Sequence, residues 1–284
     1  MYNYHFLNGN FVPLSEANLS IGDIGIVRGY GIFDFFQVVN GVPLHIEEHI
    51  NRFLNSAKEL RLDIGYDATL LKEYVNQLIK INDIHFAGIK FLATGGFSSD
   101  GFDIGAPTVA ILCHPYKTIP DEFTDHGAKL LSHEYVRSMP TVKTTNYIMA
   151  IYLSEKVKKQ GAIEPLYYSK TSVSECSRSN IFAVFNDKLV TPDKNILLGI
   201  SRNQVIKLAG NLGYPVEQRD IPLGELLRAD EVFITGTLKK VLPIVKIDDH
   251  VIGTGLPGSI TKIIQDKLDK LERAIIESQT HAII

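Results

Sequence analysis

Short apolar segments flank Asn8-Gly9 near the start of the chain, and the same arrangement recurs around Asn40-Gly41. Asn-Gly is the strongest short signal for a β-hairpin because both turn positions need positive φ. The pattern therefore predicts two hairpins. Their strands are expected at residues 4–7 and 10–12, and at residues 33–39 and 42–45, with further strands at 88–94 and 107–113.

Helical spacing of apolar residues follows the second hairpin. Residues 47–60 are expected to form a helix whose inward positions are Ile50, Phe53, Leu54, Ala57 and Leu60. A second helix is expected at residues 68–81. This half of the chain is thus predicted to be an α+β unit with a largely antiparallel sheet.

Residues 114–121 carry two prolines and no apolar periodicity, which is typical of a linker. We therefore expect an N-terminal domain at 1–114, a linker at 115–122 and a C-terminal domain at 123–284. Strands of the second domain are expected at 129–136, 164–168, 172–175, 180–185, 189–191 and 231–235, with strand material to 252. Its helices are expected at 146–159, 201–212, 223–227 and after Pro257-Gly258. Both domains are then α+β.

Composition narrows the class of protein. The chain has 284 residues, 45% hydrophobic and 21% charged, which favours a folded globular protein of two domains. A formal net charge of −3 argues against a nucleic-acid binder. Its two cysteines lack metal-ligand spacing and suit a reducing compartment. For that reason we expect no metal. No secretion signal or membrane span is visible, so we expect a cytoplasmic protein.

The segment Thr141–Tyr147 lies between an expected strand and an expected helix. Thr144 or Thr145 is expected to cap that helix. Its apolar side should contain Ile148, Ile151, Tyr152 and Leu153. A lysine in such a turn, Lys143, could be held in a cleft where loss of water disfavours the ammonium form, as a Schiff-base lysine requires. An ordinary surface lysine is the commoner alternative, and Lys90 in an apolar strand is a rival.

Two stretches could bind an anion. Gly199-Ile200-Ser201-Arg202 precedes an amphipathic helix, whose first N–H groups and Ser201 hydroxyl suit a phosphate. A plain helix cap is the alternative, and the Arg202 side chain is expected to point outward. Thr235-Gly236-Thr237 ends an apolar strand and could hold a phosphate or a carboxylate, or form an ordinary turn.

Two charged residues extend these candidates. Glu175 ends a strand before small polar residues and could bind a cationic ring nitrogen, or form a salt bridge with Arg178 or a lysine. Arg52 lies next to the inward-facing Phe53 on its expected helix. Its side chain could reach a phosphate, or it could remain solvated. The pattern His45-x-x-Glu48-His49 resembles a zinc-protease motif, but His45 would end a strand, which places it off the helix.

Taken together, the motifs resemble the class IV, or fold type IV, pyridoxal-phosphate enzymes. This group includes branched-chain aminotransferases, D-amino-acid aminotransferases and aminodeoxychorismate lyases. The matching marks run in order along nearly the whole chain: Asp23-x-Gly25-x-x-Arg28-Gly29-Tyr30-Gly31-Ile32-Phe33-Asp34, His49-x-x-Arg52-Phe53, Lys143-x-x-Asn146-Tyr147, Glu175-x-x-x-Ser179-Asn180-Ile181-Phe182, Gly199–Arg202, Ala229–Phe233 and Thr235–Thr237. The resemblance implies a smaller N-terminal domain and a larger C-terminal domain with the cofactor between them.

The resemblance also implies a role for each matching residue. Lys143 is similar to the lysine that forms the Schiff base and moves the proton, and Glu175 to the carboxylate that keeps the ring nitrogen protonated. The other implied contacts of pyridoxal 5'-phosphate are Arg52, Ile200, Ser201 and Thr237 at the phosphate, Tyr147 near the ring oxygen, and Ser179 and Asn180 beside Glu175.

Substrate positions depart from the family pattern. Phe33 stands where D-amino-acid aminotransferases tend to have a tyrosine, and Gln37 where branched-chain enzymes place an arginine. The loop at 95–101 lacks an arginine found in many members. The expected substrate contacts are Arg28, Tyr30, Phe33 and the Leu238 N–H, with Arg137 as a further carboxylate partner.

The expected activity is transfer of an amino group between an amino acid, branched-chain or similarly apolar, and a 2-oxo acid. The alternatives are an aminodeoxychorismate lyase that releases pyruvate and a D-amino-acid aminotransferase. A silent cofactor-binding protein is disfavoured because both Lys143 and Glu175 are present. The resemblance implies a homodimer that acts on small molecules.

Overall fold

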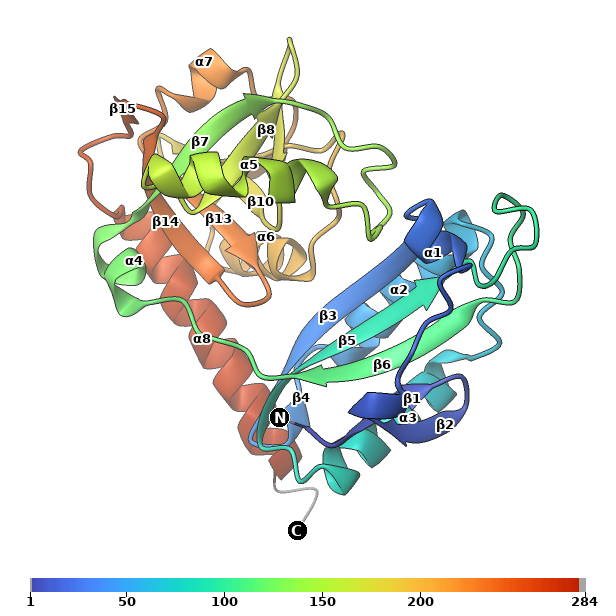
Figure 1. Ribbon diagram of the computed structural model, residues 1–284. Helices are drawn as coiled ribbons and strands as arrows, with labels where there is room; N and C mark the ends of the chain where they lie inside the picture. The colour runs from blue at the N-terminus through green and yellow to red at the C-terminus, as the bar shows by residue number, and fades with distance from the viewer. Residues whose placement is uncertain (1, 281–284) are drawn as a thin grey trace. The chain divides into compact units, whose positions relative to one another are not determined.

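The computed structural model describes residues 2–280 (Figure 1). The chain divides into two compact units. The first contains the residues up to Lys117, the segment Val142–Asn146 and the residues from Arg273 onward. The second contains Thr118–Thr141 and Tyr147–Glu272.

A six-stranded antiparallel sheet forms the centre of the first unit. Its order is β2-β1-β6-β5-β3-β4. The strands are β1 (Tyr4–Leu7), β2 (Asn10–Pro13), β3 (Gly31–Val39), β4 (Val42–Pro43), β5 (Phe86–Thr94) and β6 (Thr108–His114). Asn8 and Asn40 adopt φ of 46° and 52°, and the glycine after each also has positive φ, so both predicted hairpins are confirmed.

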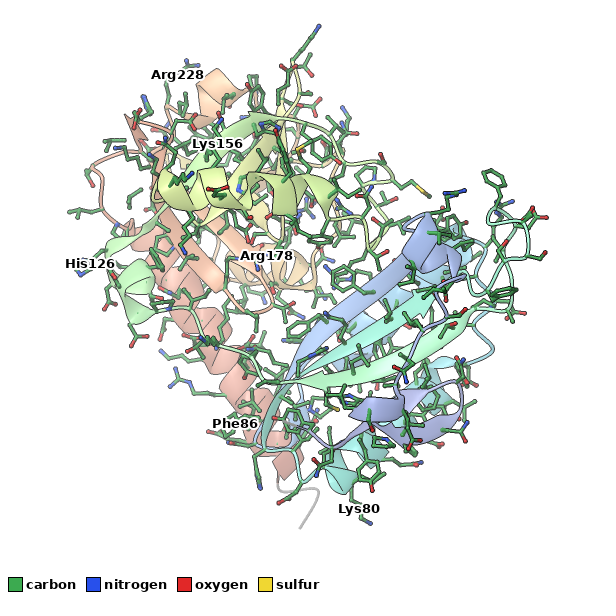
Figure 2. All side chains as sticks on the ribbon, viewed as in Figure 1. Lys80, Phe86, His126, Lys156, Arg178 and Arg228 are labelled. Atoms are coloured by element: carbon green, nitrogen blue, oxygen red, sulfur yellow. The ribbon has the colours of Figure 1, made fainter. Side chains whose placement is uncertain are left out.

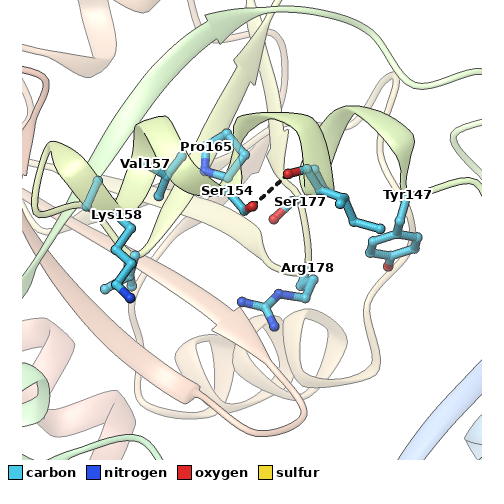
Figure 3. Close-up of a pocket in the computed structure, with 11 residues that line it drawn as sticks. Tyr147, Ser154, Val157, Lys158, Pro165, Ser177 and Arg178 are labelled. Carbon is cyan, nitrogen blue, oxygen red and sulfur yellow. Dashed lines mark hydrogen bonds between the residues drawn. The ribbon is translucent and has the colours of Figure 1, made fainter.

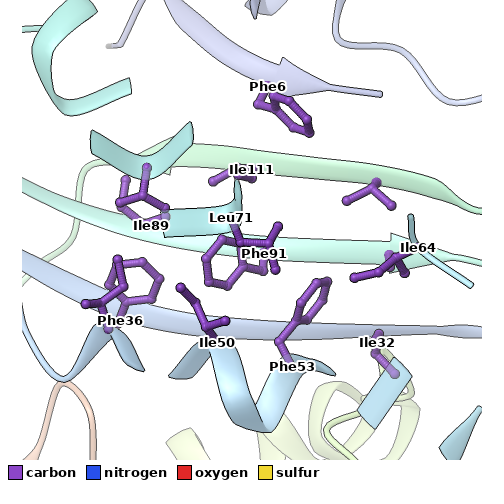
Figure 4. Packing of buried hydrophobic residues seen from close by; sticks show 14 of the residues in the cluster. Phe6, Ile32, Phe36, Ile50, Phe53, Ile64, Leu71, Ile89, Phe91 and Ile111 are labelled. Atoms are coloured by element: carbon purple, nitrogen blue, oxygen red, sulfur yellow. The ribbon is translucent and has the colours of Figure 1, made fainter. Parts of the chain in front are cut away.

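The first face of this sheet packs against two helices, α2 (Ile46–Glu59) and α3 (Ala68–Ile81), both at the predicted positions. Shorter helices, η1 (Leu14–Glu16) and α1 (Ile24–Val27), precede β3. Phe53 of α2 stacks on Phe91 of β5 at 5.2 Å between ring centroids, and Phe36 lies 5.3 Å from the same ring (Figure 4). Each buried phenylalanine contributes on the order of 1.5–3 kcal/mol.

Strand alternation directs a different set of side chains to the second face of the sheet. Phe33 pairs with Leu92, Phe35 with Lys90, and Lys90 with Leu112. The residues between them belong to the core under α2 and α3. The second face is therefore mostly apolar, with the Lys90 ammonium among aromatic and aliphatic side chains.

The segment around Lys143 pairs with β3. Phe33 N donates to the Lys143 carbonyl at 2.9 Å, and Thr145 N donates to the Gly31 carbonyl at 2.9 Å. Val142 is buried in the core of the first unit. Lys143 is thus grouped with the first unit, whereas the predicted boundaries assign it to residues 123–284. Those domain boundaries stay a prediction.

The second unit contains a mixed sheet of nine strands. Its order is β12-β11-β10-β13-β14-β7-β8-β9, with β15 paired to β14. The strands are β7 (Ala128–Glu134), β8 (Glu164–Tyr168), β9 (Val173–Cys176), β10 (Asn180–Phe185), β11 (Lys188–Thr191), β12 (Val216–Gln218), β13 (Glu231–Gly236), β14 (Lys240–Ile247) and β15 (His250–Val251). The pair Asn180↔Glu175 joins β10 back to β9 and closes a ring of strands.

Helices surround this sheet, as predicted. They are α4 (Asp121–His126), α5 (Ile148–Lys159), α6 (Ile200–Asn211), α7 (Leu223–Leu226) and α8 (Ser259–Thr280). α6 and α8 pack against a face that includes Phe182 and Phe233, whose rings stack at 4.9 Å. The prediction of an α+β fold in both halves is confirmed, while α1, α4 and β12 were not predicted.

Two expectations about α5 are wrong. The helix begins at Ile148 after Tyr147, with no side-chain cap, and Thr145 Oγ1 donates instead to the Gly31 carbonyl. Ile148, Ile151 and Tyr152 are 75%, 71% and 77% exposed, whereas Leu153 and Val157 are buried. Apolar residues occupy two faces of this helix, and only the face with Leu153 and Val157 packs against the sheet.

The expectation that Arg202 points outward is also wrong. Its side chain is 2% exposed, and Nη2 donates to the Pro192 carbonyl at 2.9 Å and to Gln218 Oε1 at 3.1 Å. These partners come from the segment after β11 and from β12. Arg202 therefore joins α6 to the edge of the sheet.

Candidate active site

Lys143 is fixed by backbone contacts on both sides of its strand-like segment. Its N–H lies 3.4 Å from Ser56 Oγ on α2, and its carbonyl accepts from Phe33. The side-chain Nζ lies 4.7 Å from the centre of the Phe33 ring. The candidate Schiff-base lysine therefore projects beside an aromatic side chain of the second sheet face.

Arg52 is oriented by a buried acid, Asp34 of β3. Arg52 Nε and Nη2 donate to the two Asp34 oxygens at 2.7 and 2.8 Å. His49 Nδ1 lies 2.7 Å from Oδ1, and Phe35 N donates to the same oxygen. Burial alone would raise the pKa of Asp34, but the charge and hydrogen bonds of Arg52, then those of His49, hold that pKa well below its usual range.

This arrangement fixes the guanidinium of Arg52 in one plane. A bidentate carboxylate matches the planar fork of an arginine, so the side chain loses little further freedom when an anion binds. Asp34 lies in the quoted motif at 23–34, but the sequence did not reveal its role. Its partners stand 15 and 18 residues away, on a different element.

Glu175 is buried at the end of β9 in the second unit. Its Oε1 accepts from Arg137 Nη1 at 2.7 Å. Its Oε2 accepts from Leu197 N at 2.9 Å and from Asn180 Nδ2 at 3.5 Å. These donors favour the carboxylate form, which is the form that a protonated ring nitrogen needs. Glu175 thus forms a salt bridge with Arg137, whereas Arg178, the partner considered from the sequence, pairs with Glu164.

Glu164 holds two turns of the second unit. It accepts from Arg178 N at 3.3 Å, lies 3.3 Å from Arg178 Nε, and forms a buried ion pair with Lys239. Burial raises the pKa of Glu164, but Lys239 and Arg178 outweigh it and lower that pKa overall. Arg178 lies between β9 and β10, and Lys239 between β13 and β14. The carboxylate therefore ties these two turns together.

Three segments of the second unit meet next to these turns and enclose buried polar atoms. Ser179 Oγ and Thr235 Oγ1 are buried and have no hydrogen-bond partner among residues 2–280. A Cβ on Gly236 would lie 3.0 Å from the Arg178 carbonyl, and one on Gly199 would lie 2.1 Å from Asn180 Oδ1. A side chain at Gly199 would require Asn180 to move, and one at Gly236 would be tightly packed against the Arg178 carbonyl. Buried hydroxyls normally form hydrogen bonds, so two without an acceptor fit the binding of a cofactor that carries a phosphate.

The N-terminus of α6 lies beside these segments, since Gly199 is next to Asn180. The N-cap residue is Gly199, which offers no side chain to the first turn. The N–H groups of Ile200 and Ser201 belong to that turn, where a helix leaves its donors without intrahelical partners. Thr237 is half-buried in the turn between β13 and β14. The predicted phosphate contacts of the second unit thus lie on segments that the structure brings together.

Tyr147 lines a cavity of about 330 Å³ between α5 and the turn that carries Ser177 and Arg178 (Figure 3). Burial raises the pKa of its phenol to about 12, with the charges of Arg137 and Glu175 acting in opposite directions. The hydroxyl therefore stays protonated at neutral pH and can donate a hydrogen bond.

The four residues expected to contact substrate differ in their exposure and in their hydrogen-bond partners. Arg28 is exposed and donates to the carbonyls of Val27 and Gly101. The Tyr30 hydroxyl donates to the Leu60 carbonyl at 2.7 Å. Phe33 lies beside Lys143, and Leu238 is half-buried in the turn after β13. Their contacts with substrate stay predictions. Within residues 2–280 no group of three His, Cys, Asp or Glu side chains is placed to bind a metal.

The family model "Amino-transferase class IV" matches residues 31–247. The chain therefore belongs to the class IV aminotransferases, and the expected aminotransferase activity is confirmed at that level.

The relatives agree with this assignment. The chain is 33% identical to a putative branched-chain-amino-acid aminotransferase of Methanocaldococcus jannaschii, over 92% of this chain and 94% of the relative. It is 32% identical to the D-alanine aminotransferase of Staphylococcus aureus strain N315, over 93% and 96%. A solved branched-chain amino acid aminotransferase with pyridoxamine 5'-phosphate is 27% identical, with a TM-score of 0.88 over 94% and 93%. The prediction of fold type IV is confirmed.

Proposed function

We propose that this chain is a pyridoxal-phosphate-dependent transaminase that takes an apolar, branched-chain-like amino acid as one substrate. The observation that carries the proposal is a group of buried polar atoms in the second unit. Its buried Ser179 and Thr235 hydroxyls, its glycine-lined turns and the carboxylate of Glu175 each suit one polar part of that cofactor. Class IV membership gives independent support.

Each candidate residue has a distinct task. Ile200 N–H, Ser201, Thr237 and Arg52 would hold the phosphate, and Glu175 would hold the ring nitrogen. When bound, the cofactor supplies an electron sink for bonds at the substrate α-carbon. Lys143 Nζ would anchor the cofactor and then move the α-proton, while the Tyr147 hydroxyl would donate a hydrogen bond. Arg137 would keep Glu175 ionised throughout.

The apolar side chains near Lys143 support the substrate class. Phe33, Phe35 and Leu92 lie on the second face of the first-unit sheet, and the Phe33 ring contacts the lysine. The relative named as a D-alanine aminotransferase makes a D-amino acid the second candidate. A screen of L- and D-amino acids with pyruvate or 2-oxoglutarate decides the hand. Pyruvate release without any amino acceptor would instead indicate a lyase.

The cofactor assignment has a direct test. Purified protein should be yellow, and borohydride reduction followed by peptide mapping should place the cofactor on Lys143. A matched reduction of Lys90→Met should give the same labelled peptide. Label on Lys90, or on no lysine, would refute the assignment.

We further propose a cytoplasmic homodimer. Ile148, Ile151 and Tyr152 of α5 are exposed apolar side chains, which supports burial of this face against a second copy. Both cysteines are free, as suits a reducing compartment. In residues 2–280 the structure has no helix with the length and hydropathy of a membrane span. Sedimentation should show a dimer that Ile151→Asp weakens. An unchanged dimer would mean that another surface pairs.

A further inference from the structure

The turn between β13 and β14 is anchored by one side chain. The register of the two strands ends where Gly236 pairs with Lys240, which leaves three residues in the turn. Of these three, Lys239 alone forms a side-chain hydrogen bond among residues 2–280, and its ammonium donates to Glu164 Oε1. The hydrogen bonds of the sheet do not fix the middle of this turn. Thr237, the candidate phosphate contact in it, therefore depends on Lys239 for its position.

The turn after β9 is held by the same carboxylate. Glu175 pairs with Asn180, so residues 176–179 lie outside the ladder of the sheet. Arg178 N donates to Glu164 Oε2 at 3.3 Å, and Arg178 Nε lies 3.3 Å from Oε1. The Arg178 side chain is 63% exposed (Figure 2). Water weakens an exposed ion pair, so the backbone N–H is the more important of the two contacts.

The burial of Glu164 is not explained by stability. Its side chain is 1% exposed and that of Lys239 is 9% exposed, so both charges have left water. The attraction within such a pair often fails to repay the loss of hydration, and well-packed apolar residues in its place are frequently as stable. What the pair provides that apolar residues do not is a directional contact with two turns.

The two turns lie against each other at the buried hydroxyls. A Cβ on Gly236 would lie 3.4 Å from Ser179 Oγ. Thr235 Oγ1 belongs to the same place, because Thr235 pairs with Asn180, the residue after Ser179. Two cations share the one carboxylate of Glu164, so a net positive charge remains beside the turns. Such a charge attracts an anion.

We infer that Glu164 is a positioning residue for the phosphate of the cofactor. Its own negative charge would repel a phosphate, so it acts through the groups that it holds rather than by contact. Its ion pair with Lys239 keeps the Thr237 hydroxyl in place, and its contact with the Arg178 N–H does the same for the Ser179 hydroxyl. These donors then keep their direction before the ligand binds. The inference rests on the proposed function and adds to it a residue that determines cofactor affinity.

The first test removes the charge of this residue and keeps its shape. Titration of the apo-protein of Glu164→Gln should give a dissociation constant for pyridoxal 5'-phosphate roughly tenfold above that of the wild type, the low end for loss of a hydrogen bond to a charged group. Pyridoxal, which lacks the phosphate, should bind both proteins equally. If the carboxylate acted only by its charge, its removal would tighten phosphate binding, and that result would overturn the inference.

A matched control separates this role from a purely structural one. Glu231 accepts from Ile260 N and Thr261 N at the start of α8, and it lies at the other end of β13. Both Glu164→Gln and Glu231→Gln should lower the melting temperature, but Glu231→Gln should leave both dissociation constants unchanged. Equal losses of affinity for pyridoxal 5'-phosphate and pyridoxal in Glu164→Gln, or no loss for either, would make Glu164 structural and overturn the inference.

A second variant tests the inference without altering the buried acid. Lys239→Met removes the anchor of its turn, while Arg178 remains as a cation for Glu164. Affinity for pyridoxal 5'-phosphate should fall as in Glu164→Gln, and the double variant should lose little more than either single one, because the two residues act as a pair. Lys239→Arg should retain most of the wild-type affinity. Full affinity in Lys239→Met would overturn the inference.

The outcomes also distinguish this inference from the proposed function. Wild-type protein that binds no pyridoxal 5'-phosphate would overturn both. Wild-type protein that binds the cofactor and transaminates, with an affinity that neither Glu164→Gln nor Lys239→Met changes, would overturn the inference alone. Binding that depends on Glu164 and Lys239 in a protein that transaminates no amino acid would overturn the proposed function and leave the positioning role in place.

Discussion

Replacement of Asp34 by asparagine tests whether a buried ion pair aims the candidate phosphate-binding arginine. The asparagine keeps the shape but loses the charge, and its amide group would face Arg52 Nε as a second donor. Loss of one partner from a buried pair costs about 3–5 kcal/mol. The Arg52 side chain is slightly exposed, so we expect the lower end, about 3 kcal/mol, and a fall in Tm of roughly 6–12 °C.

Urea unfolding at pH 7 measures this change, with Asp103→Asn as the control because Asp103 is an exposed aspartate of the same unit. Cofactor affinity from titration of the apo-protein should fall in parallel, since Arg52 loses its orientation. A loss of stability below about 1 kcal/mol, the value of a surface pair, would refute the reasoning. So would unchanged cofactor affinity in a folded Asp34→Asn variant.

The same variant has a pH signature. The pKa of Asp34 is lower in the folded protein than the value of about 3.9 expected in the unfolded chain. Its ionised form therefore stabilises the fold fully above pH 4, and this contribution is lost as the pH falls below that value towards the folded pKa. Acid unfolding of wild type should contain this component, and Asp34→Asn should lack it. Parallel acid profiles for the two proteins would contradict this linkage.

Three further predictions concern the other charged groups. Arg52→Ala should raise the cofactor dissociation constant, measured by titration of the apo-protein, roughly ten- to a hundredfold. Lys58→Ala, at an exposed position of the same helix, should change it little. Equal losses of affinity in the two variants would mean that Arg52 does not bind the phosphate. Glu175→Gln should retain cofactor but lose most turnover in steady-state assays, and wild-type turnover would make Glu175 structural. Arg202→Ala should lower stability by about 1–3 kcal/mol, because Gln218 Oε1 and the Pro192 carbonyl lose their donor, and a neutral result in urea unfolding would contradict this.

Local patterns predicted the elements of this fold well. The Asn-Gly turns at 8–9 and 40–41 depend only on two adjacent residues, and the helix at Ala68–Ile81 is signalled by its own apolar period. The orientation of α5 was not predictable in this way. Its apolar residues lie on two faces, and only tertiary packing selects the face with Leu153 and Val157.

The residues of the candidate site also differ in how far they could be predicted from local sequence. The groups expected to contact the cofactor could be found because their motifs are short and ordered along the chain. The groups that hold them could not, since their partners are distant in sequence. Asp34 and Arg52 are 18 residues apart, and Glu164 and Lys239 are 75 apart. Arg202 was misplaced for the same reason, because its acceptors lie 10 and 16 residues away.

The charged groups at the candidate site are thus held by buried opposite charges rather than by solvent. In the first unit Asp34 holds Arg52, and in the second Glu164 holds the turns that carry Arg178 and Lys239. Glu175 forms an ion pair with Arg137. A buried pair is costly to break from one side, so these groups keep their charge and direction before a ligand arrives.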